Sequence, residues 1–95
     1  MKINISDVVE ATCGRDAGRI FFVIGLADGY AEIANGTTRR VENPKKKKLK
    51  HLKPTAYDGG ATALKLMAGE KVTNRELKRA LSGIKEASQE ATGGM

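Results

Sequence analysis

The chain has 95 residues, which is enough for one small domain with a limited hydrophobic core. Seventeen lysines and arginines against eleven aspartates and glutamates give a formal net charge of +6, and this sign favours a polyanionic partner. A single cysteine excludes an intramolecular disulfide, and with a single histidine it cannot furnish a four-ligand zinc site.

The first predicted strand lies near the N-terminus. Isoleucines alternate with polar residues over 2–6, and an apolar run continues from Val8 to Cys13. A break near Ser6-Asp7 is compatible with this pattern. Cys13 has no obvious base and orienting carboxylate to activate it as a nucleophile, so we expect a buried or half-buried structural thiol.

A glycine-bounded loop, residues 14–18, leads into an apolar stretch. Over residues 19–26, β-branched and aromatic side chains alternate with a period of two, which predicts a strand rather than a helix. One face of this strand carries Ile20, Phe22, Ile24 and Leu26, and the other carries Phe21, Val23 and Gly25.

Two turn sequences divide the next segment. Asp28-Gly29 predicts a tight hairpin, because glycine adopts positive φ without steric cost, and a second strand should return over Tyr30–Ala34. Asn35-Gly36 repeats this turn chemistry, so we expect a third strand over 37–41, before Pro44 prevents further ladder donation. The three strands would form an antiparallel meander.

Four consecutive lysines, Lys45–Lys48, follow the third predicted strand. Their mutual repulsion disfavours compact packing and predicts a loop. Beyond them, Leu49 and Leu52 predict a short returning strand or a single helical turn that packs both leucines on the barrel. Lys50 and Lys53 should then point outward.

The pattern changes from strands to helices after residue 54. Residues 61–67 predict a short helix ended by Gly69, and Thr73 with Glu76 forms a capping box that begins a second helix. Apolar residues at helical spacing give this second helix one stripe, made of Leu77, Leu81 and Ile84. We expect the stripe to pack on Leu64 and Met67 or on the barrel.

The order of strand, loop and strand around Gly18 resembles the KOW motif, whose hallmark is one glycine amid alternating apolar and hydrophilic residues. The wider frame is GRDAGR, an apolar strand, an acidic turn and the basic segment NPKKKKLKHL. This frame is similar to small bacterial KOW-domain RNA-binding proteins, akin to the e-type large-subunit ribosomal protein number fourteen of archaea and eukaryotes. The resemblance covers residues 5–54, with a looser match over 64–87.

The resemblance implies a mainly β fold, a small SH3-like barrel of the KOW type with about five strands, followed by a short helical C-terminal tail. We expect the barrel over 1–54, a helical extension packed on or beside it over 55–92, and a disordered tail over 93–95. The Asp58-Gly59-Gly60 stretch departs from a continuous helix, which leaves the length of the first tail helix open.

The resemblance also implies association with the ribosome or ribosomal RNA, and the charge distribution indicates where contacts would lie. Between Arg39 and Lys53, eight basic residues accompany the single acidic residue Glu42, a net charge of +7. We expect phosphate contacts from a basic strand, the lysine loop and the arginines bracketing the glycine-bounded loop. The candidates are Arg15, Arg19, Arg39, Arg40, Lys45, Lys46, Lys47, Lys48, Lys50 and Lys53, with Gly18 as the structural motif residue.

These candidates have simpler alternatives. Asp16 or Glu10 can pair with Arg15 or Arg19 in a solvated ion pair worth little, and the lysine run can be a merely solvated loop. Aromatic residues are also scarce, which argues against sequence-specific recognition of single strands by base stacking. They are Phe21, Phe22, Tyr30 and Tyr57.

The favoured function is a non-catalytic RNA-binding protein, monomeric when free, with further contacts to ribosomal proteins. The sequence has no metal-ligand cluster, nucleophile elbow or Walker glycine loop, so we expect neither an enzyme nor a cofactor. It also lacks a signal-peptide core and any apolar run of membrane-spanning length, so we expect a cytoplasmic location and no membrane partner. The alternative is a protein-interaction adaptor of the translation or transcription machinery, as in elongation factors whose KOW barrels this chain resembles.

Overall fold

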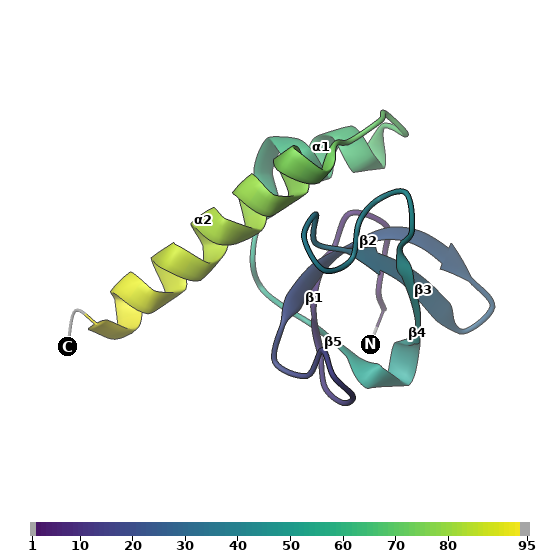
Figure 1. Ribbon diagram of the computed structural model, residues 1–95, viewed down its shortest axis with the longest axis horizontal. Coiled ribbons are helices and arrows are strands. Elements are labelled where there is room, and N and C mark those ends of the chain that lie inside the picture. The colour runs from purple at the N-terminus through teal and green to yellow at the C-terminus, as the bar shows by residue number, and fades with distance from the viewer. Residues whose placement is uncertain (1, 94–95) are drawn as a thin grey trace.

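The computed structural model describes the backbone of residues 2–93 and the side chains of residues 2–84. Its five strands form one antiparallel sheet in the order β4-β3-β2-β1-β5. The strands are β1 (Val8–Ala11), β2 (Ile20–Ala27), β3 (Tyr30–Ala34), β4 (Lys45–Lys48) and β5 (Leu52–Pro54). β4 and β5 are the two edges, so the sheet curls without closing (Figure 1). The small, mainly β domain is consistent with the expected SH3-like fold.

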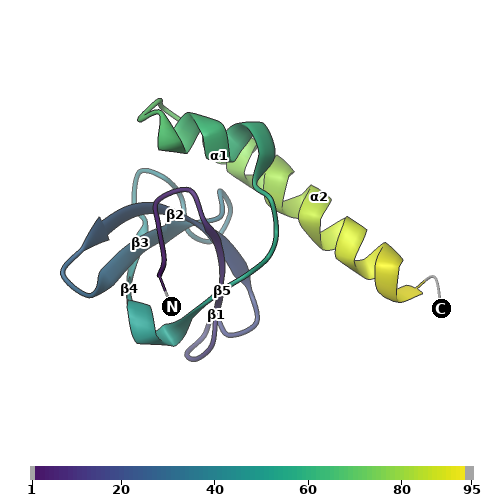
Figure 2. The ribbon, with the colours of Figure 1, turned by 180° about the vertical axis from the view of Figure 1, so that it is seen from behind.

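Three helical elements complete the described chain. A 3-10 turn, η1 (Leu49–His51), joins β4 to β5, and the α-helices α1 (Gly60–Met67) and α2 (Asn74–Gly93) follow. Figure 1 shows both α-helices on one side of the sheet, with the C-terminal part of α2 extending away from it. The reverse view in Figure 2 shows the extended segment that connects β5 to α1. Within residues 2–93, no helix has the length and apolarity needed to cross a membrane.

The inner face of the curled sheet holds the first hydrophobic cluster. Side chains from four strands meet there, and Ile3 and Leu49 pack against them. The buried members are Val9, Ala11, Phe21, Val23, Ala31, Ile33 and Leu52. The predicted packing of Leu49 and Leu52 is confirmed, and both Lys50 and Lys53 are exposed as expected.

The second cluster lies between the outer face of the sheet and α2. Phe22 of β2 and Leu77 of α2 are both fully buried in it. The other buried members are Val8, Ala34 and Leu81. The apolar stripe of α2 therefore packs on the sheet, one of the two predicted alternatives, whereas Leu64 and Met67 of α1 are 66% and 68% exposed.

A β-bulge changes the faces of β2 near its end. The register against β3 shifts between Val23 and Gly25, so that Leu26 lies opposite Ala31. Cross-strand partners share a face of the sheet. Leu26 therefore falls on the side of Ala31 rather than with Ile24, where strict alternation placed it.

β1 is shorter than the N-terminal pattern predicted. Residues 2–6 form no strand, and β1 begins at Val8. Ser6 adopts a φ of 84°, which L-residues with side chains rarely take, and its N–H donates to the Val23 carbonyl at 2.8 Å. The irregular backbone thus falls near Ser6-Asp7, where a break was anticipated, but no strand precedes it.

Two predicted turns around β2 depend on positive φ. Gly18 has a φ of 86°, and Gly29 has a φ of 79° in the two-residue turn between Ala27 and Tyr30. At either glycine an added Cβ would meet no described atom within 4 Å. The backbone dihedral, rather than a close approach, is therefore what requires glycine at these positions.

The predicted strand over 37–41 is wrong, since this segment consists of bends and turns. The side-chain Oδ1 of Asn35 accepts hydrogen bonds from the backbone N–H groups of Thr37 and Arg39. The N–H of Val41 donates to Oδ1 of Asn74 instead of to a strand. Because side chains hold these backbone donors, the segment cannot use them in the ladder of a sheet. β3 pairs with β4 instead.

The capping box at the start of α2 is confirmed. The backbone N–H of Glu76 donates to Oγ1 of Thr73, and the N–H of Thr73 donates to Oε1 of Glu76, both at 3.1 Å. Lys65 of α1 also forms an ion pair with Glu76 at 2.6 Å. The hydrogen bond from Lys65 is the largest cause that lowers the pKa of Glu76, and the backbone hydrogen bond to Thr73 lowers it further.

The first residue of α2 fixes the helix to the loop between β3 and β4. Oδ1 of Asn74 accepts the Val41 N–H at 2.8 Å, and its amide donates to the Glu42 carboxylate. Gly36 allows this close approach, because a Cβ there would overlap the Asn74 carbonyl oxygen. Helix and sheet are thus joined by polar contacts as well as by the second cluster.

The C-terminal ends of α1 and α2 can be compared with the predicted helix end and the predicted disordered tail. α1 ends before Gly69, which has a φ of 76°, as expected for a glycine that ends a helix. α2 runs to Gly93, the first residue of the expected disordered tail. Gly94 and Met95 lie outside the described residues.

Candidate nucleic-acid interface

The lysine run forms an edge strand, not the predicted loop. β4 pairs antiparallel with β3, with Lys45 opposite Ile33 and Lys47 opposite Ala31. β3 supplies the hydrogen-bonding partners that the lysine backbone needs. Successive side chains of a strand point to opposite faces, so neighbouring ammonium groups are kept apart. Repulsion along the run is therefore weaker than the sequence suggests.

The four lysines divide between the two faces of the sheet. Lys46 and Lys48 lie on the outer face, where the partly exposed Tyr30 is the cross-strand partner of Lys48. Lys45 and Lys47 lie on the inner side, and only Lys47 is half-buried. No carboxylate among residues 2–84 forms an ion pair with any of the four.

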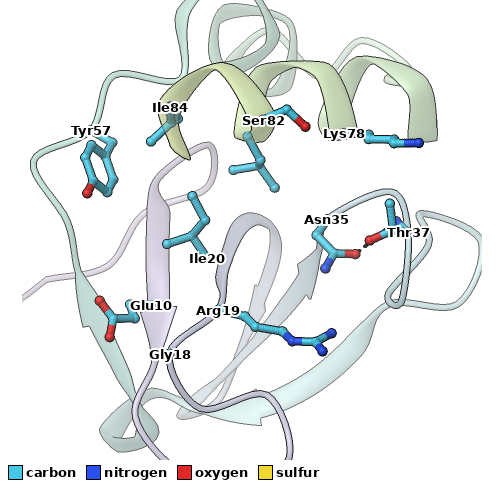
Figure 3. A pocket seen from close by; sticks show the side chains of 11 residues that line it. Glu10, Gly18, Arg19, Ile20, Asn35, Thr37, Tyr57, Lys78, Ser82 and Ile84 are labelled. Carbon is cyan, nitrogen blue, oxygen red and sulfur yellow. Dashed lines mark hydrogen bonds between the residues drawn. The ribbon is translucent and has the colours of Figure 1, made fainter. Parts of the chain in front are cut away.

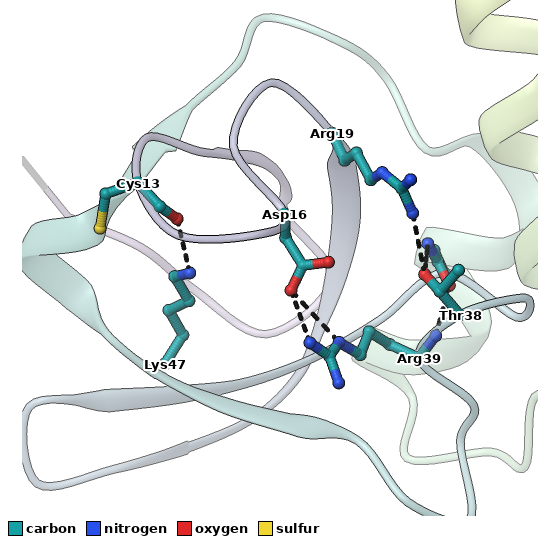
Figure 4. Close-up of polar contacts among 7 residues, drawn as sticks. Cys13, Asp16, Arg19, Thr38, Arg39 and Lys47 are labelled. Carbon is teal, nitrogen blue, oxygen red and sulfur yellow. Dashed lines mark hydrogen bonds and ion pairs between the residues drawn. The ribbon is translucent and has the colours of Figure 1, made fainter.

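Lys47 connects this edge strand to the glycine-bounded loop. Its Nζ donates to the backbone carbonyl of Cys13 at 2.8 Å (Figure 4). Cys13 is exposed, so the expected burial of its thiol is wrong. The reason is its position beyond the last residue of β1, where the chain turns away from the core.

Arg39 is held by Asp16 of the same loop. Its Nε and Nη2 donate to Oδ2 of Asp16 at 3.2 and 2.8 Å, and Asp16 is only 5% exposed (Figure 4). The acidic partner considered for Arg15 or Arg19 thus pairs with Arg39. A guanidinium occupied in this way has fewer donors left for phosphate than an unpaired one.

Arg15 and Arg19, which flank Asp16 in the sequence, are both exposed. Arg19 makes a long hydrogen bond, 3.5 Å from Nη1 to Oγ1 of Thr38. Neither arginine forms an ion pair with a carboxylate among the described side chains. These two arginines, with Lys47, surround the glycine-bounded loop with positive charge.

Arg40 lies outside this group, in an exposed ion pair. Its Nε is 3.6 Å from Oε2 of Glu42, and both side chains are more than half exposed, so the pair is worth little. The hydrogen bond from the Asn74 amide is the largest cause that lowers the pKa of Glu42, and the charge of Arg40 contributes least.

The remaining candidates are spread over the sheet. Lys50 is exposed on η1, and Lys53 is exposed on β5, the edge opposite β4. The structure therefore places Lys47 against the glycine-bounded loop that carries Arg15 and leads to Arg19, and leaves Lys53 on the other edge. The role of Asp16 was missed, although its sequence signal is visible as one acidic residue between two arginines in a glycine-bounded loop.

The chemistry offered by this surface is electrostatic. Among the residues that the structure describes, no three His, Cys, Asp or Glu side chains gather so as to hold a metal ion. Comparison with protein-family models and with curated protein sequences gives no match. Inference about function therefore depends on the chain's own residues and their geometry.

Proposed function

We propose that the protein is a non-catalytic RNA-binding protein that associates with the ribosome and contacts ribosomal RNA phosphates. The observation that supports this most is β4, an edge strand of four lysines. None of them forms an ion pair with a carboxylate among the described residues, although Lys46 lies opposite Glu32 of β3. Ammonium groups outside ion pairs are suited to phosphate oxygens, because no carboxylate neutralises their charge.

The arrangement favours reading of RNA shape over reading of sequence. An A-form duplex has a narrow major groove that side chains cannot read, whereas its phosphates are accessible on the outside. The lysines lie on both faces of one edge strand, so they can contact phosphates on either side of it, and the exposed Arg15 and Arg19 can add further phosphate contacts. Such contacts position a protein on RNA without selecting bases.

Arg39 has a structural role in the proposed RNA-binding surface. Its bond to the nearly buried Asp16 links the glycine-bounded loop to the segment after β3. That link orders the loop that carries Arg15 and that leads to Arg19. Gly18, with its positive φ, has a structural part in the same loop.

An adaptor function is the second candidate, and one observation favours it. Leu64 and Met67 of α1 are about two-thirds exposed, an unusual placement for large apolar side chains on a short helix. A protein of the translation or transcription machinery could cover this face. The positive charge of the lysine strand has no evident use in such a contact.

Two measurements test the proposal. The purified protein should carry RNA, read as a 260/280 nm absorbance ratio that falls after nuclease treatment. A tagged copy should sediment with ribosomal subunits at low salt and leave them as salt rises, because salt screens phosphate contacts. A nuclease-insensitive ratio together with salt-resistant association to a protein complex would favour the adaptor.

A further inference from the structure

A groove of about 470 Å³ lies between α2 and the start of β2 (Figure 3). This volume is within the range of about 300–1,000 Å³ of small-ligand sites. One wall is apolar, with Ile20 from β2 and with Leu81 and Ile84 from α2. These three side chains belong to the second cluster, so the wall is part of the folded core and does not need a ligand to form.

The two ends of the groove differ in charge. Figure 3 shows Arg19 and Lys78 toward one end, and Glu10 and Tyr57 toward the other. Lys78 is exposed on α2 and has no ion-pair partner among the described residues. Two cations from separate elements therefore lie toward one end, with Asn35 and Thr37 between them, and a carboxylate and an aromatic ring lie toward the other.

We propose that this groove binds one unpaired nucleotide of an RNA chain, an inference that rests on the proposed function. The phosphate lies at the end lined by Arg19 and Lys78, the sugar lies along the apolar wall, and the base lies toward Tyr57. Each end then meets a group of complementary chemistry, since phosphate is anionic and a base has an apolar face that stacks on aromatic rings.

The carboxylate end gives the site a base preference. A carboxylate accepts hydrogen bonds only, so Glu10 favours bases that present an exocyclic amine, such as cytosine N4. Uracil presents a carbonyl oxygen at the same position, which a carboxylate repels. The groove should therefore prefer cytidine to uridine, although the lysine strand itself does not distinguish bases.

This site differs from the lysine strand in the RNA that it needs. β4 can contact the phosphates of a fully paired duplex, but the groove requires a nucleotide that has left the stack. The probes are an RNA hairpin with a single bulged cytidine, the same hairpin with bulged uridine, and the fully paired hairpin. Affinities are measured at one fixed salt concentration.

The native protein should bind the bulged-cytidine hairpin about tenfold more tightly than the paired one, the scale of a single stacked base. Tyr57→Ala, Lys78→Gln and the uncharged, groove-filling Ser82→Phe should each remove most of this preference. Glu10→Gln should remove the preference for cytidine over uridine. The matched control is Arg75→Gln, which removes one exposed charge from α2 outside the groove and should keep the tenfold ratio.

The outcomes separate this inference from the proposed function. Equal affinity for bulged and paired hairpins, or a preference that survives both Tyr57→Ala and Ser82→Phe, would overturn the groove and leave the lysine strand in place. Failure to bind any of the three hairpins would overturn both. The folded state of each variant is checked by its melting temperature, so that lost preference is not confused with unfolding.

Discussion

Arg39 bonds Asp16 through two of its guanidinium nitrogens, at 2.8 and 3.2 Å, and this contact joins two loops that are 23 residues apart in the chain. Asp16 is 5% exposed, so its charge depends on Arg39 for compensation. The arrangement of the glycine-bounded loop therefore depends on a contact with a distant segment, and not on its local sequence alone.

Replacing Asp16 with Asn should therefore lower the free energy of unfolding by about 1–3 kcal/mol, because Arg39 loses a charged partner in a partly buried site. Urea unfolding measures this change. The matched control, Asp28→Asn in the exposed turn between β2 and β3, should change stability by less than about 0.5 kcal/mol. Equal effects of the two substitutions would mean that the Arg39 contact does not stabilise the loop.

Gly18→Val should destabilise the fold before it affects RNA binding. A β-branched residue at a φ of 86° costs about 1–3 kcal/mol in backbone strain. Gly18→Asn is the control, since asparagine tolerates this region better and should cost less. If Gly18→Val kept the native melting temperature while RNA affinity fell, Gly18 would be a contact residue and its structural assignment would be wrong.

Replacing Lys45, Lys46, Lys47 and Lys48 with Gln should weaken binding to many RNAs alike. It should also flatten the dependence of log affinity on log salt by about 0.7–0.9 for each phosphate that the variant no longer neutralises. The control removes four exposed charges elsewhere, at Lys2, Lys71, Arg75 and Arg79. An identical slope in both variants would mean that net charge, and not the edge strand, governs binding.

Leu77→Ala should lower the free energy of unfolding by about 2–5 kcal/mol, because Leu77 is fully buried against the sheet. Leu64→Ala is the matched control, since Leu64 is 66% exposed on α1, and it should cost far less. Calorimetry should record the loss as a single lowered transition, because α2 and the sheet share one cluster. Two separate transitions would instead make the helices an independent unit.

Acid should weaken the junction of α1 and α2. The pKa of Glu76 is lowered in the folded protein from its ordinary value of 4.5, chiefly by Lys65. Its contribution to stability is therefore present above the ordinary value and is lost as pH falls through the lowered one. The melting temperature should drop between about pH 5 and pH 3, and Glu76→Gln should make this drop smaller. The control is Glu70→Gln, which removes an exposed carboxylate and should leave the size of this drop unchanged.

Local sequence patterns correctly predicted the elements that are held by contacts between residues close together in the sequence. The hairpin at Asp28-Gly29 and the capping box of Thr73 and Glu76 each involve residues a few positions apart, and both are present. The faces of β2 followed its alternation up to Val23, beyond which a bulge reversed them. Such a bulge is set by the register with β3, which no single strand reveals.

The failures of prediction came from contacts between distant residues. Segment 37–41 has strand-like composition, yet Asn35 and Asn74 take its backbone donors. The lysine run has loop-like charge, yet the open edge of β3 makes it a strand. Among the candidate site residues, the sequence indicated where positive charge lies. It did not indicate that Arg39 is engaged by Asp16 or that Lys78 lies across a groove from Arg19.

The edge position of β4 also affects how copies of the protein meet one another. An uncovered edge strand offers unpaired backbone groups to any similar strand, and lysines oppose such pairing by repulsion. If two copies approached along β4, each would bring four ammonium groups to the same interface. A polyanion that neutralises these groups would remove that repulsion. Mixtures of the protein with RNA should therefore become turbid near charge balance and clear again when either component is in excess.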